Sequence, residues 1–206
     1  MSWKVIHRLG DNQVLLDSND GNILQIPLSD NEPMRAAYSV FIPGYVPYAL
    51  PTDIISIQGS ATKNIRIRGL QFSGAAQSAA NIFINTVRRS SANTGGTPST
   101  ITPCRRVIAD DVATAKIVTY AAQPSALGAV VDGGFADGGR LNIAPAANGG
   151  IDRLLLQYSW LNDRAPILSG LTDFLNLSLA SNPITLTGNT WPNLGAIDVN
   201  IIWTED

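Results

Sequence analysis

The chain is 206 residues long and has the composition of a globular protein with a small share of charge. Apolar residues make up 45% of it, enough for a substantial core, whereas charged residues make up 15% against about 25% in average soluble chains. The length fits one large domain, or one domain with an appendage, and the 18 glycines and 12 prolines interrupt the sequence too often for a helical bundle.

Single copies of cysteine and histidine exclude several kinds of site. Cys104 has no partner for an intrachain disulfide or a cysteine-based zinc site, and a catalytic triad would have to use His7. We therefore expect no cofactor and no metal. Proline breaks the apolar stretches before they reach the roughly 20 residues of a membrane-spanning helix, and the N-terminus lacks the apolar run of a secretory signal. We expect a soluble protein made in a cytosol.

The first 35 residues are predicted to form a hairpin arm and a linker. Asp20-Gly21 lies between two apolar runs, 14–16 and 23–26, which is a strong signal for a β-hairpin. A polar segment at 29–33 that ends in proline indicates a linker. We expect an arm at 1–35 and a second domain at 36–206.

The second domain shows an apolar period of two, which is typical of strands with one buried face. Alternation runs through 64–68 and then changes phase, so we predict a bulge at Gly69. The same period appears at 82–84, 154–160, 175–179 and 197–203. Residues 110–122 are a helix candidate, but the β-branched residues at 117–119 favour a strand.

Four other segments are predicted to be irregular or exposed. The turn at 59–63 lacks the spacing of a phosphate-binding loop, and 132–139 resembles a glycine-rich turn more than a calcium-binding repeat. Residues 90–103 are expected to form an exposed loop, and the prolines of 41–48 make this segment unsuited to an inner strand. The pattern as a whole predicts an all-β protein: a jelly-roll-like antiparallel β-sandwich with an N-terminal β-hairpin arm.

Charge is segregated along the chain. Seven basic residues and no acidic one lie between Asp53 and Asp110, whereas five acidic residues and no basic one lie between Arg8 and Arg35. Three interpretations stay open: the acidic arm pairs with its own basic domain, it reaches a neighbouring subunit or partner protein, or the basic stretch binds nucleic acid. The dispersed bases and the few aromatics among them disfavour nucleic acid.

Acidic and aromatic residues suggest two further alternatives. Asp152 and Asp163 flank an aromatic strand and are the candidate pair for a glycoside hydrolase. Trp160 and Trp191 are candidates for stacking on sugar rings, whereas the alternation around Trp203 favours a place in the core.

Four segments resemble a known class of proteins: GSATKNIRIRGLQFSG (59–74), INTVRRSSANTGGTPS (84–99), TYAAQPSALG (119–128) and DVNIIWTED (198–206). They are similar to small virion proteins of tailed bacteriophages, of the capsid decoration (cement) type, over about residues 38–206. The resemblance implies a β-sandwich without catalytic residues that binds the outer head shell, often as a trimer. The arm is unmatched.

We therefore expect a non-enzymatic virion protein, made in the bacterial host, that binds the major capsid protein and copies of itself, with a homotrimer as the expected assembly. The alternative is a carbohydrate- or receptor-binding module of a tail fibre or other tail structure. The candidate interface residues are Trp3, Asp17, Asp20, Arg66, Arg68, Arg88, Arg89, Arg105, Arg106, Tyr45 and Tyr48.

Overall fold

β-Strands make up every regular element that the structure describes. A computed structural model describes residues 3–9, 13–18, 23–27, 35–47, 52–75, 80–143, 153–157, 165–180 and 195–206. Within these ranges there is no helix and every strand pair is antiparallel, so the all-β prediction is confirmed. None of the described residues belongs to a helix of the length and hydropathy that crossing a membrane requires.

The chain divides into two compact units, Met1–Arg35 and Ala36–Asp206. The first unit holds a three-stranded sheet in the order β1-β2-β3. Strands β2 and β3 pair on either side of the predicted Asp20-Gly21 turn, whose own residues lie outside the described ranges. Strand β1 pairs with β2, so the unit has a third strand that the predicted hairpin lacked. The bounds are β1 (Trp3–Leu9), β2 (Gln13–Ser18) and β3 (Ile23–Pro27).

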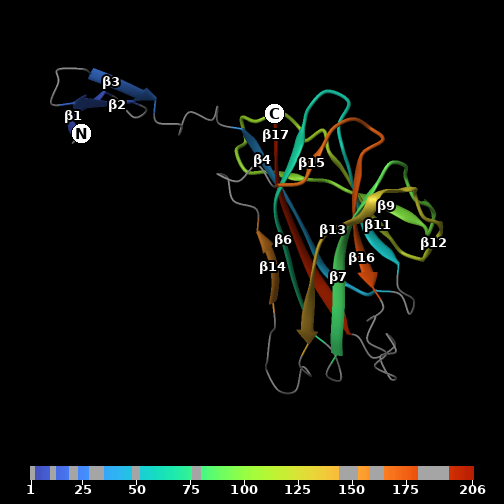
Figure 1. Ribbon diagram of the computed structural model, residues 1–206. Coiled ribbons are helices and arrows are strands. Elements are labelled where there is room, and N and C mark those ends of the chain that lie inside the picture. The colour runs from blue at the N-terminus through green and yellow to red at the C-terminus, as the bar shows by residue number, and fades with distance from the viewer. Residues whose placement is uncertain are drawn as a thin grey trace. The chain divides into compact units, whose positions relative to one another are not determined.

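The second unit, called the body below, contains two large antiparallel sheets packed as a sandwich (Figure 1). The first sheet has the order β10-β4-β17-β6-β14, with β15 also paired to β6. Its strands are β4 (Ala36–Tyr45), β6 (Ile65–Ala75), β10 (Cys104–Arg105), β14 (Arg153–Gln157), β15 (Ile167–Leu168) and β17 (Ala196–Glu205).

The second sheet has the order β13-β7-β16-β5-β11-β9. The chain crosses from β9 in this sheet to β10 in the first sheet through residues 102–103, which joins the sheets at one edge. Its strands are β5 (Asp53–Gln58), β7 (Ala80–Arg89), β9 (Pro98–Ile101), β11 (Lys116–Tyr120), β13 (Val130–Ile143) and β16 (Phe174–Ala180). Two short strands, β8 (Thr94–Gly95) and β12 (Pro124–Ala126), pair separately.

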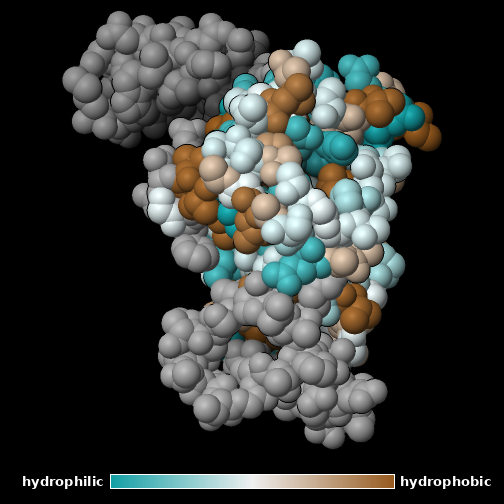
Figure 2. All heavy atoms as spheres, turned by 90° about the vertical axis from the view of Figure 1, so that its right-hand side faces the viewer, coloured by the Kyte–Doolittle hydropathy of each residue, from teal (hydrophilic) through white to brown (hydrophobic). Residues whose placement is uncertain are grey.

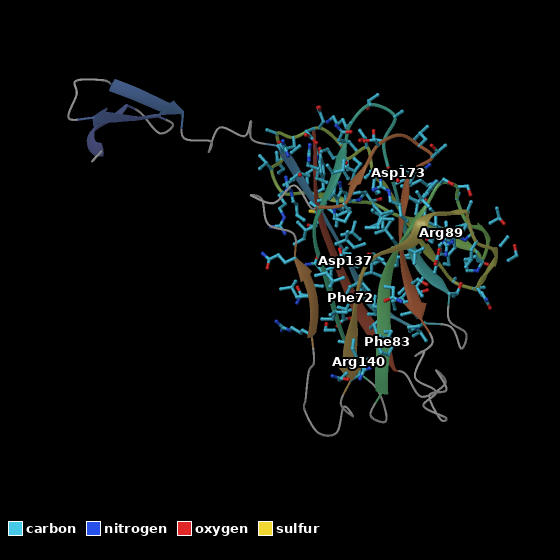
Figure 3. The ribbon with its side chains drawn as sticks, viewed as in Figure 1. Phe72, Phe83, Arg89, Asp137, Arg140 and Asp173 are labelled. Atoms are coloured by element: carbon cyan, nitrogen blue, oxygen red, sulfur yellow. The ribbon has the colours of Figure 1, made fainter. Side chains whose placement is uncertain are left out.

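Alternation along β17 determines the core face of the first sheet. Ile197, Val199, Ile201 and Trp203 are all fully buried, whereas the alternate residues Asp198, Asn200 and Ile202 are only partly buried. The core placement predicted for Trp203 is therefore confirmed. Across the sandwich the second sheet contributes fully buried side chains of β5, β11 and β16, and Phe72 of β6 lies in the same core (Figure 3).

The predicted phase change in β6 comes from a β-bulge. Ile202 of β17 pairs with Gly69, but the next residue, Trp203, pairs with Ile67. Arg68 is therefore the extra residue of a bulge that lies directly before Gly69. The sequence pattern placed the bulge at Gly69, one residue later. The bulge lets apolar residues on both sides of it face the core.

Two predicted irregular segments are strands. Residues 132–139 were expected to form a turn, but they lie inside β13. The first of two register shifts against β7 contains Gly133 and Gly134, whereas Gly138 and Gly139 pair in regular register with Asn85 and Ile84. Residues 90–103 were expected to form a loop without structure, but they contain β8 and β9. Strand β8 forms by pairing with β12, and β9 forms by pairing with β11. Both partners are distant in the sequence, so no local pattern predicts these strands.

The proline-rich segment 41–48 also differs from its prediction. Residues up to Tyr45 belong to β4, an inner strand between β10 and β17. Strand β10 covers only Tyr38 and Ser39, so Pro43 lies where that edge is unpaired, and a register shift against β17 falls at the same place. Proline is tolerated at such an edge and bulge.

Two other predictions are confirmed. Residues 116–120 form strand β11 rather than a helix, and 59–63 is a turn between β5 and β6. In that turn the Ser60 hydroxyl accepts hydrogen bonds from the main-chain N–H groups of Thr62 and Lys63.

The central part of the second sheet is buried on both faces, which the period of two did not predict. Asn176 was expected to face solvent between buried leucines, but it is fully buried. Ser56, its partner on the adjacent strand β5, is only 3% exposed. Residues 90–97 and 121–129 cover this face, held in part by hydrogen bonds between Ser90 and Ala129. The covering segments are remote from β16 in the sequence, so the residues of β16 alone do not indicate that they are covered.

Replacing Ile201 with alanine tests the two-faced assignment of β17. Ile201 is fully buried, so the Ile201→Ala variant should lose about 2–5 kcal/mol of unfolding free energy. Its neighbour Ile202 lies on the other face and is partly exposed, so Ile202→Ala should lose clearly less. Urea denaturation measures both, and equal losses would contradict the assignment.

Candidate interaction surface

Acidic residues from distant parts of the body neutralise most of the basic stretch. The sequence predicted an exposed basic region, but the fold brings carboxylates to it from positions up to 140 residues away. The pairs are Lys63 with Asp111 at 3.7 Å, Arg66 with Asp206 at 3.2 Å, Arg88 with Asp173, and Arg89 with Asp53 at 2.7 Å. The segregation of charge along the chain is therefore largely absent within the folded body.

The Arg89–Asp53 pair is buried and fastens the loops that cover the second sheet (Figure 3). Arg89 Nε lies 2.7 Å from Asp53 Oδ2, and its Nη1 donates to the main-chain oxygen of Gly128 at 2.7 Å. Asn93 donates to the same carboxylate oxygen at 2.9 Å and accepts from the N–H of Gly128. One ion pair thus connects β5, β7 and both covering segments.

Burial corrects the prediction for two interface candidates. Arg68 and Arg89 were expected on an exposed contact surface, but they are only 7% and 5% exposed. Arg68 is the bulge residue of β6, and its Nε donates to the Thr204 hydroxyl at 3.2 Å. Arg66 and Arg88 keep more exposure, yet each is held by a carboxylate of the body.

Arg105 and Arg106 are the two arginines of the stretch that stay exposed and form no ion pair among the described residues. They begin the segment of residues 105–113 that links β10 to β11, which we call the anchored loop. Arg105 Nη1 donates to the main-chain oxygen of Asp110 at 2.8 Å, across the loop. A hydrogen bond of 3.1 Å from Asp110 N to Val107 O closes the turn at its tip.

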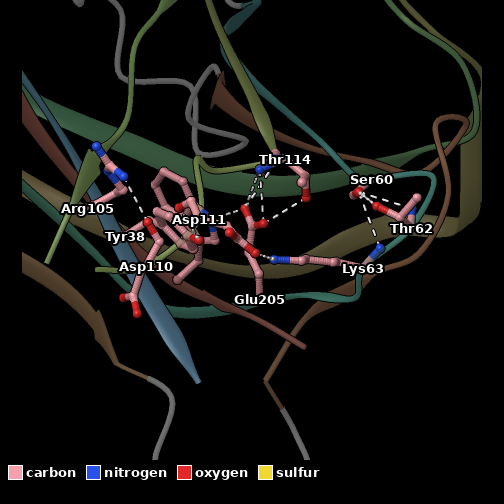
Figure 4. Close-up of polar contacts among 11 residues, drawn as sticks. Tyr38, Ser60, Thr62, Lys63, Arg105, Asp110, Asp111, Thr114 and Glu205 are labelled. Carbon is pink, nitrogen blue, oxygen red and sulfur yellow. Dashed lines mark hydrogen bonds and ion pairs between the residues drawn. The ribbon is translucent and has the colours of Figure 1, made fainter. Parts of the chain in front are cut away.

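The body holds the anchored loop at several points (Figure 4). Arg106 N donates to Ala37 O at 2.9 Å, and the Tyr38 hydroxyl donates to Asp111 O at 2.9 Å. The Asp111 carboxylate also pairs with Lys63 of the turn between β5 and β6. Strand β4 and a second loop therefore fix both limbs.

Glu205 fixes the residues that follow the loop. Its buried carboxylate accepts hydrogen bonds from Thr114 N, the Thr114 hydroxyl, Ala115 N and the Trp203 indole at distances from 2.7 to 3.1 Å. The rings of Trp203 and Tyr38 stack with centroids 5.7 Å apart. The end of β17 thus fixes the base of the loop.

This loop displays apolar side chains despite its anchors. Val107, Ile108 and Val112 are 46%, 89% and 72% exposed. Because hydrogen bonds already order the backbone of this loop, a partner that covered these side chains would cause little further loss of conformational entropy. In Figure 2, which shows a different face of the body, residues of near-neutral hydropathy cover much of the described surface.

The other interface candidates fall in three places. Tyr45 is partly buried and its hydroxyl donates to Tyr120 O at 3.0 Å, so the body holds it. Trp3 and Asp17 lie in β1 and β2 of the first unit, where the structure describes strand pairing only. The interface candidates Asp20 and Tyr48 lie outside the described residues. So do the candidates for glycoside hydrolysis and sugar stacking: Asp152, Asp163, Trp160 and Trp191.

The described side chains bring together no constellation for metal chemistry. No group of three or more His, Cys, Asp or Glu residues in the described ranges is arranged to hold a metal ion. Burial raises the pKa of Tyr38, and the nearby carboxylate of Glu205 raises it further. Burial also raises the pKa of Tyr120. Both phenols therefore stay protonated at neutral pH.

Sequence reasoning identified Arg105 and Arg106 but missed the rest of this surface. The apolar residues Val107, Ile108 and Val112 stand among charged neighbours, a signal that was available in the sequence. The role of Glu205 could not be predicted from the sequence, because its hydrogen-bond partners Thr114 and Ala115 lie about 90 positions earlier in the chain.

Comparisons with known proteins find no match for this chain among models of protein families, curated proteins or solved structures.

Removing the charge of Asp53 tests whether the buried ion pair holds the covering segments. Asp53→Asn leaves the buried Arg89 guanidinium without its counter-charge, so about 3–5 kcal/mol of unfolding free energy should be lost. The control is Asp111→Asn, because that side chain is 88% exposed and its pairing should contribute less than about 1 kcal/mol. Similar losses in thermal or urea unfolding would refute the structural role of the pair.

The raised tyrosine pKa values predict a loss of stability at alkaline pH. A group whose pKa is higher in the folded state stabilises the fold below its ordinary value of 10.0, and this contribution disappears as pH rises through the raised pKa. In an absorbance titration of the native protein, at least the two tyrosines Tyr38 and Tyr120 should ionise late. Tyr38→Phe should remove one late step. Ionisation of all tyrosines near pH 10.0 in a folded protein would contradict the prediction.

Proposed function

We propose that this chain is a non-enzymatic structural protein of a bacteriophage virion, a capsid decoration protein that binds the major capsid protein on the head shell and copies of itself. The proposal includes a jelly-roll-like connectivity of the sandwich, an arm formed by the first unit, and a homotrimeric assembly. It joins the resemblance of four sequence segments to the properties of the described surface.

The observation that carries the proposal is the anchored loop. Hydrogen bonds from β4 and an ion pair to Lys63 order it, yet it exposes three β-branched apolar side chains. An enzyme would be expected to converge polar groups in a cleft, whereas this loop presents apolar groups outward on an ordered support. Such a surface suits contact with another protein.

The charge arrangement supports a contact function as well. Ion pairs inside the body neutralise Lys63, Arg66, Arg88 and Arg89, so little net field is left to attract nucleic acid. A subunit that makes many modest contacts on a repeating shell gains avidity from the lattice.

Electron microscopy of the native particle tests the proposal. The expected result is density that fits the body at regularly repeated positions on the head shell, with Val107, Ile108 and Val112 against a neighbouring chain. Density on a tail fibre would overturn the decoration role in favour of the tail alternative. Absence of the chain from purified particles would overturn both.

A further inference from the structure

The anchored loop carries charges of both signs on its two limbs, separated by its apolar tip. Arg106 lies on the limb before Ile108, and Asp110 lies on the limb after it. Neither side chain forms an ion pair among the described residues, although the neighbouring Asp111 pairs with Lys63. Arg106 is exposed and Asp110 is partly exposed, so the body leaves one cation and one anion of the loop within reach of a partner.

A surface with this layout is complementary to itself. In a two-fold contact the same patch meets its copy, and when the axis is perpendicular to the plane of the loop, a residue on one limb faces the opposite limb of the partner. Two anchored loops packed tip to tip would bring Ile108 against its copy and place each Arg106 beside the Asp110 of the other chain. Both apolar burial and charge pairing are then satisfied by one arrangement.

We infer that the anchored loop is a self-association site that docks on the same loop of a second copy of this chain. The ordering of the loop favours the contact, because Arg106 N–Ala37 O, Tyr38 Oη–Asp111 O and the Glu205 cluster have already fixed its backbone. The inference concerns contact between two copies and is independent of particle binding.

The small size of the patch sets the strength of this contact. Three exposed apolar side chains and one pair of charges per copy cover far less than the roughly 1,200–2,000 Å² of a stable interface. We therefore expect a dimer with a Kd of about 10–100 µM, which is the range of transient contacts.

Analytical ultracentrifugation of two charge-reversed full-length variants tests the pairing. Arg106→Glu and Asp110→Lys each place like charges opposite each other in the dimer, so each variant alone should associate about tenfold more weakly than the wild type. Mixed in equal amounts, the two variants restore both pairs. The mixture should then regain a species of twice the 21.9 kDa monomer mass.

Controls separate this site from general stickiness and from unfolding. Ile108→Ser should weaken association, whereas Leu155→Ser, which removes a 57% exposed apolar side chain from β14, should leave it unchanged. Circular dichroism and the unfolding midpoint should match the wild type, because Ile108 is 89% exposed. If a charge variant fails to fold, the pair Ile108→Ser and Leu155→Ser decides the question.

Three results would overturn the inference. The first is a wild-type chain that stays monomeric up to about 500 µM, which is well above the expected Kd. The second is a variant mixture that associates no better than its components. The third is equal weakening of association by Leu155→Ser and Ile108→Ser. A chain that is monomeric in solution but decorates the head would overturn this inference and the homotrimer of the proposal, and would leave the decoration role standing. A dimer that is absent from particles would leave it standing and overturn the proposed function.

Discussion

The fold depends on the insertion of β17 between β4 and β6. This strand is the last in the sequence, and it pairs along almost its whole length with two strands that precede it by more than 100 residues. Its alternating side chains, from Ile197 to Trp203, fill the core face of the first sheet. Because β17 lies between β4 and β6, it connects the β10-β4 side of the first sheet to the β6-β14 side.

The end of the same strand also organises the surface. Trp203 stacks on Tyr38, and the Glu205 carboxylate gathers the N–H groups that follow the anchored loop. A carboxylate buried with several donors is stable because each hydrogen bond to it is charge-assisted. The core and the anchored loop are therefore parts of one connected structure, and the rigidity of the loop follows from the packing of the sandwich.

Electrostatics inside the body follow the topology rather than the sequence. Antiparallel strands with long connections bring Asp173 to Arg88 and Asp206 to Arg66, although each pair is far apart in the chain. The basic stretch thereby loses most of its expected field, and Arg105 and Arg106 remain as its exposed charges without ion pairs among the described residues. Polar neutral residues and internally paired charges together account for a surface that suits protein contacts.

The all-β class, a bulge in β6 close to Gly69 and the core face of β17 could be predicted from the amino-acid sequence, because a period of two and a change of phase are local properties of the chain. Tertiary contacts, in contrast, bury Asn176 and Arg89, extend β13 through a glycine-rich segment and let Glu205 support a distant loop. Each of these depends on a partner supplied by a remote segment. Such partners are chosen by packing and long-range pairing, which no pattern of neighbouring residues records.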